Sequence, residues 1–158
     1  MISETLKSRF KQEVQQRGFY PYDAAKFCGL APGPILDCMN HGKPPGARKM
    51  AIICVAFDLS ADYLFGLSDE NKPLNPQCTF ESVYSYSDVF YSRIKTVLKT
   101  YKELRDFCEH VGLKENRLYR SYSYGMFPTT EICVKLAVYA GVSLDWLLGL
   151  SDKGGPDE

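Results

Sequence analysis

The chain lacks both an excess of charge of one sign and any long apolar run. Its 158 residues carry 19 basic and 19 acidic side chains, a formal net charge of zero. A strongly basic composition would favour nucleic-acid binding by itself, and that signal is missing. No segment approaches the roughly 18 consecutive apolar residues of a membrane span. The polar N-terminus, MISETLKSRFKQEV, does not resemble a secretory signal. We therefore expect no membrane partner and a cytoplasmic location.

The sequence also lacks the residue spacings that bind metals or build nucleophilic active sites. Its six cysteines include no C-x-x-C pair, and most lie in apolar stretches such as IICVAF and EICVKLA. They are predicted to be reduced, buried hydrophobes, which suits the cytoplasm. The two histidines, His41 and His110, have no Cys, Ser or acidic partner fixed by a motif. No glycine-rich phosphate loop is present either, so we expect no catalytic residue, metal, cofactor or enzymatic activity.

What the chain does contain is an internal repeat. Residues 60–69 read SADYLFGLSD and residues 143–152 read SLDWLLGLSD, which is identity at seven of ten positions. The same offset of 83 residues aligns further pairs, and one added residue near Gly18 brings Ser8-Arg9 onto Ser92-Arg93. The further pairs include Gly29 with Gly112, Gly42 with Gly125 and Pro45 with Pro128. Such self-similarity indicates the duplication of a whole small domain.

The repeat divides the chain into four parts. We assign a first repeat to residues 1–69 and a second repeat to residues 87–152. Residues 70–86, which begin with two prolines among polar residues, are predicted to be a linker. Residues 153–158, KGGPDE, are predicted to be a loose tail. The linker permits two arrangements, namely two separate domains or two domains packed on each other as a compact pseudo-dimer.

Each repeat is predicted to fold into five short helices without a strand, so the fold class is all-α. In the second repeat, apolar residues recur at helical spacing in four segments before the repeated phrase. These segments start at a capping Asp88, at about residue 103, at about residue 115 and at a capping Thr129, with Gly112 as the turn after the second.

The repeated phrase is predicted to be the fifth helix. Ser143 is a good N-cap, and Asp145 complements the positive end of the helix dipole. Gly149 suits the left-handed position at the C-terminus, where Leu150 folds back over the helix. Trp146 and its counterpart Tyr63 are expected to be core anchors.

This order of elements resembles the lambda-repressor-like helix-turn-helix family, also called the XRE family. There, a G-[VL]-S turn joins helices two and three, a glycine-containing break and a proline precede helix four, and helix four ends in A-x-x-L-G-V-S. The matching stretches here are GLK at 112–114 and GLA at 29–31, the breaks at 125–128 and 42–45, LAVYAGVS at 136–143 and, more loosely, VAFDLS at 55–60. The resemblance covers nearly all of both repeats and implies two tandem five-helix lambda-repressor-like helix-turn-helix domains.

The resemblance further implies that the third helix of each repeat lies in the DNA major groove. In the second repeat this helix is KENRLYRSYSYG. Arg reads guanine through two parallel hydrogen bonds, Asn can read adenine, and Tyr can reach phosphate or sugar. The candidate DNA-binding residues are Lys114, Asn116, Arg117, Arg120, Ser121, Ser123 and Tyr124. The alternative is that these residues only solvate a helix face.

The first repeat offers a poorer reading helix. Pro32, Gly33 and Pro34 are expected to delay its start and leave about six or seven helical residues. Asp37 on its outward face would repel phosphate. The candidate DNA contacts of this repeat are Asn40, Lys43, Arg48 and Lys49.

The sequence thus predicts a sequence-specific DNA-binding transcriptional regulator of bacterial or phage type. Its partner would be double-stranded DNA, read mainly by the second repeat. The alternative is a protein–protein interaction module that kept the fold and lost DNA binding, with self-association or a protein partner served by the first repeat. Zero net charge favours this alternative, as does the absence of the Gln that the family often carries at the start of helix two. The matching positions here are Tyr20-Pro21 and Glu103-Leu104.

Overall fold

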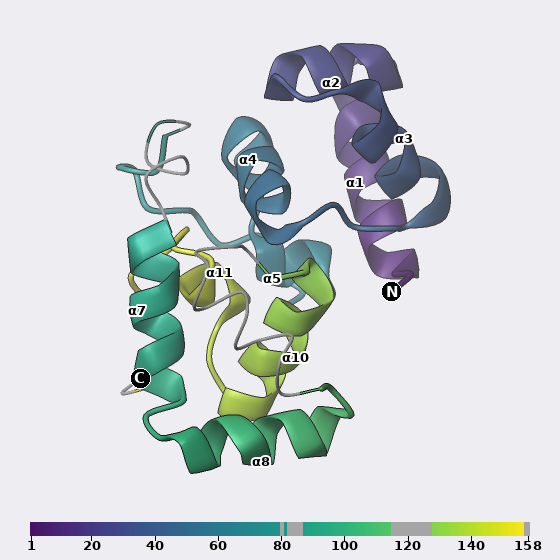
Figure 1. Ribbon diagram of the computed structural model, residues 1–158. Helices are drawn as coiled ribbons and strands as arrows, with labels where there is room; N and C mark the ends of the chain where they lie inside the picture. The colour runs from purple at the N-terminus through teal and green to yellow at the C-terminus, as the bar shows by residue number, and fades with distance from the viewer. Residues whose placement is uncertain (80, 82–86, 115–127, 157–158) are drawn as a thin grey trace.

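The computed structural model describes residues 1–79, 81, 87–114 and 128–156 (Figure 1). All regular secondary structure in these ranges is α-helical, which confirms the all-α fold class. None of the helices in the described ranges is both long and apolar enough to cross a membrane.

The first repeat contains five helices, as predicted. They are α1 (Glu4–Gln16), α2 (Pro21–Cys28), α3 (Pro32–His41), α4 (Ala47–Phe57) and α5 (Ala61–Leu64). The described part of the second repeat contains α7 (Ser87–Val97), α8 (Tyr101–Val111), α10 (Thr130–Ala140) and α11 (Leu144–Leu147). The helix predicted at about 115–123 lies outside the described residues. Helices α1 to α3 lie on one side of the molecule and α7 and α8 on the other, with α5, α10 and α11 between them (Figure 1).

The prediction for the start of α3 is wrong. The helix begins at Pro32 and has ten residues, rather than the six or seven left by a delayed start. Both prolines lie in the first turn, where the backbone N–H groups have no acceptor within the helix. Proline therefore sacrifices no hydrogen bond there, and its fixed φ favours the helical conformation.

The helix starts in the second repeat are partly as predicted. Helix α7 begins at Ser87, so Asp88 lies inside the helix and is not its cap. Helix α8 begins two residues earlier than predicted, because Thr100 and Glu103 form a capping box in which each side chain accepts from the other's backbone N–H. Thr129 caps α10 by accepting from the N–H of Ile132 at 3.3 Å, as predicted. Gly112 takes the predicted left-handed conformation after α8.

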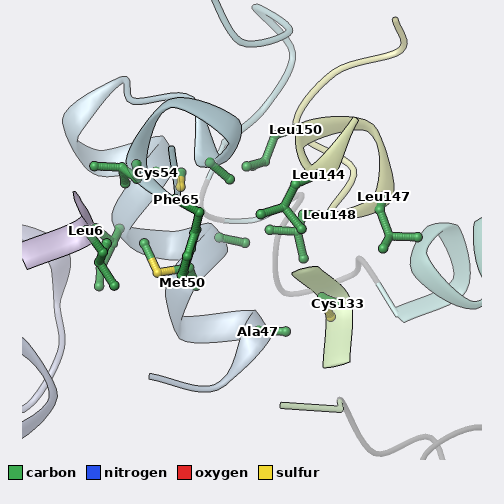
Figure 2. Packing of buried hydrophobic residues seen from close by; sticks show 14 of the residues in the cluster. Leu6, Ala47, Met50, Cys54, Phe65, Cys133, Leu144, Leu147, Leu148 and Leu150 are labelled. Atoms are coloured by element: carbon green, nitrogen blue, oxygen red, sulfur yellow. The ribbon is translucent and has the colours of Figure 1, made fainter. Parts of the chain in front are cut away.

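Buried apolar side chains of both repeats form one hydrophobic core. Figure 2 shows Leu6, Met50 and Cys54 of the first repeat alongside Leu144 and Leu148 of the second, and all five belong to the same cluster. The two repeats therefore pack on each other around a shared core, as a compact pseudo-dimer, rather than lying apart as tethered domains.

All six cysteines are free thiols in the structure. Five of the six are buried, and Cys78 is half-buried. Burial raises the pKa of the Cys28 thiol to about 12, and burial followed by the charge of Asp37 raises the pKa of Cys38 to about 12. A thiol with so high a pKa is a poor nucleophile, which agrees with a packing role.

The segment after the first repeat is attached to the second one. The N–H of Asn75 donates to the carbonyl of Leu150 at 2.8 Å, and its side-chain amide donates to Asp152 at 2.8 Å. The Sγ of Cys78 lies 3.4 Å from the carbonyl oxygen of Gly149. The first half of the predicted linker therefore does not act as an extended spacer.

The tail is not loose where the structure describes it. The N–H of Ser143 donates to the carbonyl of Gly154 at 2.9 Å. A Cβ on Gly155 would lie 3.0 Å from the indole of Trp146. The tail backbone at Gly154 and Gly155 thus lies directly against the start of α11. A residue with a side chain at either position would prevent this close approach.

Candidate nucleic-acid interface

The repeated phrase forms the same capped helix in both repeats. Ser60 and Ser143 each accept a hydrogen bond at 3.3 Å from the backbone three residues later, which confirms Ser143 as an N-cap. Gly66 and Gly149 both have left-handed φ values, 74° and 73°. The N–H of the leucine after each glycine donates to an aspartate carbonyl five residues earlier at 2.8 Å. Both α5 and α11 therefore end in a Schellman motif, as predicted for α11.

The two phrases are also joined to each other through their aspartates. Asp62 of α5 accepts from the hydroxyl of Ser143 at 2.5 Å and from the N–H groups of Leu144 and Asp145 at 2.8 and 3.0 Å. Asp145 of α11 accepts from the hydroxyl of Ser60 and the N–H of Ala61, both at 2.5 Å. Each aspartate thus binds the N-terminus of the other repeat's fifth helix.

Asp145 lies in the first turn of its own helix α11, as predicted. The first N–H groups of any helix lack partners within the helix and attract negative charge. The carboxyl of Asp145 also accepts hydrogen bonds at the N-terminus of α5, a contact that the sequence did not predict. Equivalent residues contact each other in both directions, which is the pattern of a two-fold symmetric dimer interface. The repeated phrase is thus the contact that pairs the two repeats.

A second contact between the repeats joins the starts of α4 and α10. The hydroxyl of Thr130 donates to the carbonyl of Pro45 at 2.5 Å. The N-terminal amine lies 3.6 Å from the carboxylate of Glu131. These contacts and the paired α5 and α11 together fix the position of one repeat on the other.

Two arginines that the site prediction left out hold the ends of the fifth helices. Arg9 donates to the carbonyls of Tyr63 and Ser68, and Arg93 donates to those of Trp146 and Ser151. Each guanidinium also lies over the aromatic ring of its repeat, 4.2 Å from Tyr63 for Arg9 and 4.9 Å from Trp146 for Arg93. The sequence feature that could have identified these two arginines was the match of Ser8-Arg9 with Ser92-Arg93. An arginine present at the same position of both repeats indicates that it makes the same contact in each.

The aromatic residues of the phrase are not equally buried. Trp146 is 8 % exposed, which confirms it as a core anchor. Tyr63 is only half-buried, because it packs mainly under Arg9 at the edge of the first repeat.

The carboxyl of Asp145 lies inside the paired interface. It is 4 % exposed. Burial raises its pKa to about 7, the hydrogen bond from Ser60 opposes this rise, and the nearby charge of Asp62 adds to it. Because the pKa exceeds that of an unfolded aspartate, the folded state binds a proton more tightly than the unfolded state does at neutral pH.

We expect the free energy of unfolding to fall as the pH rises from 5 to 8. The stabilisation from the protonated Asp145 carboxyl is complete below the unfolded pKa and is lost as the pH passes the folded pKa of about 7. The substitution Asp145→Asn should remove this part of the pH dependence. Urea unfolding at four pH values, with Asp69→Asn as an exposed control, measures it. An equal slope in wild type and Asp145→Asn would contradict the assignment.

The predicted DNA contacts of the first repeat lie around the end of α3 and the start of α4. Asn40, Lys43 and Lys49 are exposed, and Arg48 is half-buried. The outward face of α3 itself carries Asp37 and no lysine or arginine. The helix that the resemblance assigns to the major groove therefore has little that attracts phosphate, and the basic residues of this repeat lie beside it.

The neighbouring helix of the first repeat exposes aromatic side chains. Tyr20 is 78 % and Tyr22 is 66 % exposed at the start of α2, and Phe27 is 43 % exposed further along. Asp23 closes a capping box with the backbone of Tyr20. Sequence reasoning noted only the missing Gln here and missed this aromatic surface.

Among the predicted contacts of the second repeat, the structure places only Lys114, which is exposed just beyond α8. The other six lie outside the described residues, namely Asn116, Arg117, Arg120, Ser121, Ser123 and Tyr124.

The described parts of the chain contain no group of three or more His, Cys, Asp or Glu side chains that could hold a metal ion. Comparison with protein families, with characterised proteins and with solved structures finds no match for this chain.

Proposed function

We propose that the chain is a sequence-specific DNA-binding transcriptional regulator of bacterial or phage type, built from two tandem lambda-repressor-like helix-turn-helix domains. The observation that carries this proposal is the reciprocal pairing of the two Ser-x-Asp motifs in α5 and α11. Helix-turn-helix domains usually bind DNA as two-fold dimers on half-sites about one helical turn apart. A chain whose two repeats are paired in this way supplies both halves at once.

Covalent pairing has an energetic consequence for DNA binding. Once one repeat is bound, contact by the other is intramolecular and needs no second protein molecule. We therefore propose that the chain binds as a monomer of 17.9 kDa. The paired fifth helices already supply, within one chain, the two-fold contact that separate domains would have to form by dimerising.

The two repeats have different roles in this proposal. The second repeat reads bases, because Arg117 and Arg120 have the side chains that recognise guanine. The first repeat contributes contacts to the phosphate backbone through Lys43 and Lys49, because α3 exposes Asp37 and carries no lysine or arginine. The preferred DNA site is therefore asymmetric.

A second candidate function is protein binding through the first repeat. The exposed side chains of Tyr20, Tyr22 and Phe27 favour it, since tyrosine and phenylalanine are enriched where proteins bind one another. The two candidates differ in their dependence on salt, because contacts to phosphate weaken steeply as the salt concentration rises.

We expect the double substitution Arg117→Ala/Arg120→Ala to weaken binding to the preferred DNA at least tenfold. Each two-bond contact between arginine and guanine contributes about 1–3 kcal/mol of discrimination. Fluorescence anisotropy at two salt concentrations measures it, with the DNA upstream of the protein's own gene and a scrambled duplex of equal length.

The matched control is Lys11→Ala/Lys72→Ala, which removes the same charge from two exposed positions elsewhere in the chain. This control should lower the affinity for the preferred DNA by less than about threefold, because two charges far from the DNA contribute only weak non-specific attraction. Equal loss in both double variants would mean that only net charge matters. Equal binding of the two duplexes by the wild type would exclude sequence-specific regulation and favour protein binding.

A further inference from the structure

Helix α2 buries one face and exposes the other. The buried side chains, which lie where α2 packs against α3 and α4, are Ala24, Ala25 and Cys28. The exposed side chains, which helical geometry places on the opposite side, are Tyr22, Asp23, Lys26 and Phe27. The helix lies at the edge of the molecule, away from α7 and α8 (Figure 1). The exposed face of α2 is therefore open to another molecule.

The exposed face of α2 has a fixed shape. At the start of the helix, the Asp23 carboxylate accepts a hydrogen bond from the backbone N–H of Tyr20 at 2.9 Å. At its end, Gly29 takes a left-handed φ of 68°. The ring of Phe27 lies 5.1 Å from the ring of Phe57, which is part of the core. A face that is formed before binding loses little conformational entropy when a partner covers it.

The pattern of this face is complementary to itself. Tyr22 lies as far before the midpoint of residues 22–27 as Phe27 lies after it, and the same holds for Asp23 and Lys26. A second copy of α2, packed antiparallel about a two-fold axis at this midpoint, would place its Lys26 level with Asp23 of the first copy. The reverse contact would form as well, as it does in every two-fold symmetric interface.

The charges of the face favour a second copy over a partner that carries one sign of charge. Asp23 and Lys26 are both exposed, and neither forms an ion pair within the described part of the chain. The capping hydrogen bond of Asp23 comes from a neutral N–H group and leaves the carboxylate charged. A partner of one charge sign would attract only one of these two side chains, whereas a second copy supplies an opposite charge to each.

We propose that a second copy of the chain binds on α2, with the two helices antiparallel and Asp23 of each copy opposite Lys26 of the other. This inference names the partner for the protein-binding candidate of the first repeat, on which it rests, and it does not involve DNA. One face of an eight-residue helix is a small contact compared with the roughly 1,200 Å² of a stable interface. We therefore expect pairing at micromolar concentrations, and single chains at the nanomolar concentrations of DNA binding.

Sedimentation equilibrium of the full chain without DNA, from nanomolar to high micromolar concentrations, measures this self-association. We expect the average mass to rise from 17.9 kDa toward twice this value. Lys26→Glu should weaken pairing at least about tenfold, because it places like charges opposite each other at both contacts. Lys102→Glu is the matched control at an exposed position of α8, and it should change pairing by less than about twofold.

Mixing two variants tests the geometry of the contact. Asp23→Lys and Lys26→Glu should each pair poorly alone, whereas their equimolar mixture should pair about as well as the wild type, because opposite charges again meet at both contacts. If Asp23→Lys fails to fold without its capping carboxylate, Tyr22→Ala takes its place and should weaken pairing at least about fivefold.

Three results would each overturn the proposal. The first is an average mass that stays at 17.9 kDa, which would leave the face to a different partner. The second is equal weakening by Lys26→Glu and Lys102→Glu. The third is a mixture that pairs no better than its two components or, if Asp23→Lys does not fold, unchanged pairing of Tyr22→Ala. A chain that pairs but does not bind DNA would contradict only the proposed regulator function.

Discussion

Replacing Asp62 with alanine should lower the free energy of unfolding by about 3 kcal/mol, because it leaves three partly buried donors without their acceptor, at about 1 kcal/mol each. The Asp62 carboxylate accepts from the Ser143 hydroxyl and from two backbone N–H groups at the start of α11. Urea denaturation followed by circular dichroism measures the loss.

Asp69→Ala is the control for the loss of one carboxylate. Asp69 is fully exposed and forms an ion pair with Arg9 at 3.2 Å. Pairs of this kind contribute roughly 0–1 kcal/mol. If Asp62→Ala cost no more than Asp69→Ala, the crosswise pairing of the fifth helices would not stabilise the fold.

Gly42→Ala should also destabilise the chain by about 3 kcal/mol, from an unfavourable left-handed backbone conformation combined with a steric clash. Gly42 has φ 64°, and a Cβ there would lie 2.3 Å from the carbonyl oxygen of Ser3. The overlap cannot be relieved by a side-chain rotation because the obstructing atom belongs to the backbone. The N–H of Ser3 also donates to the carbonyl of Gly42 at 2.8 Å, which fixes the two segments together.

Gly29→Ala separates the two contributions. Gly29 has nearly the same φ, 68°, but a Cβ at this position would have no atom within 4 Å. This substitution should therefore cost only the left-handed strain, about 1 kcal/mol. Thermal or urea unfolding of the two variants side by side measures the difference. Equal destabilisation would show that the close approach of Ser3 to Gly42 does not constrain the fold.

Much of the helical structure could be predicted from the sequence because local signals determine it. Thr129 and Ser143 are caps, Gly112 and Gly149 end helices, and the apolar spacing between them is helical. The start of α3 could not be predicted in the same way. Proline stops a helix in its interior but is accepted in its first turn, and the sequence does not show on its own which case applies.

The contacts between the repeats were beyond prediction for a different reason. The sequence shows only that Asp145 lies in the first turn of its own helix. The three-dimensional arrangement is what brings the N-terminus of α5 to its carboxyl group. The docking of Gly154, and part of the docking of Asn75, is likewise made with backbone groups, which every sequence has. The repeat itself signalled that two like units exist, but not that equivalent residues of the two units bind each other.

Selection of binding sites from a random-sequence DNA library by the full chain tests most directly whether one polypeptide acts as a paired DNA reader. We expect enrichment of a single asymmetric motif, bound by one chain of 17.9 kDa as judged by light scattering of the complex. The Arg117→Ala/Arg120→Ala variant should lose that enrichment. A symmetric motif bound by a single chain would contradict the division of roles between the repeats, and no enrichment at all would contradict DNA reading by this protein.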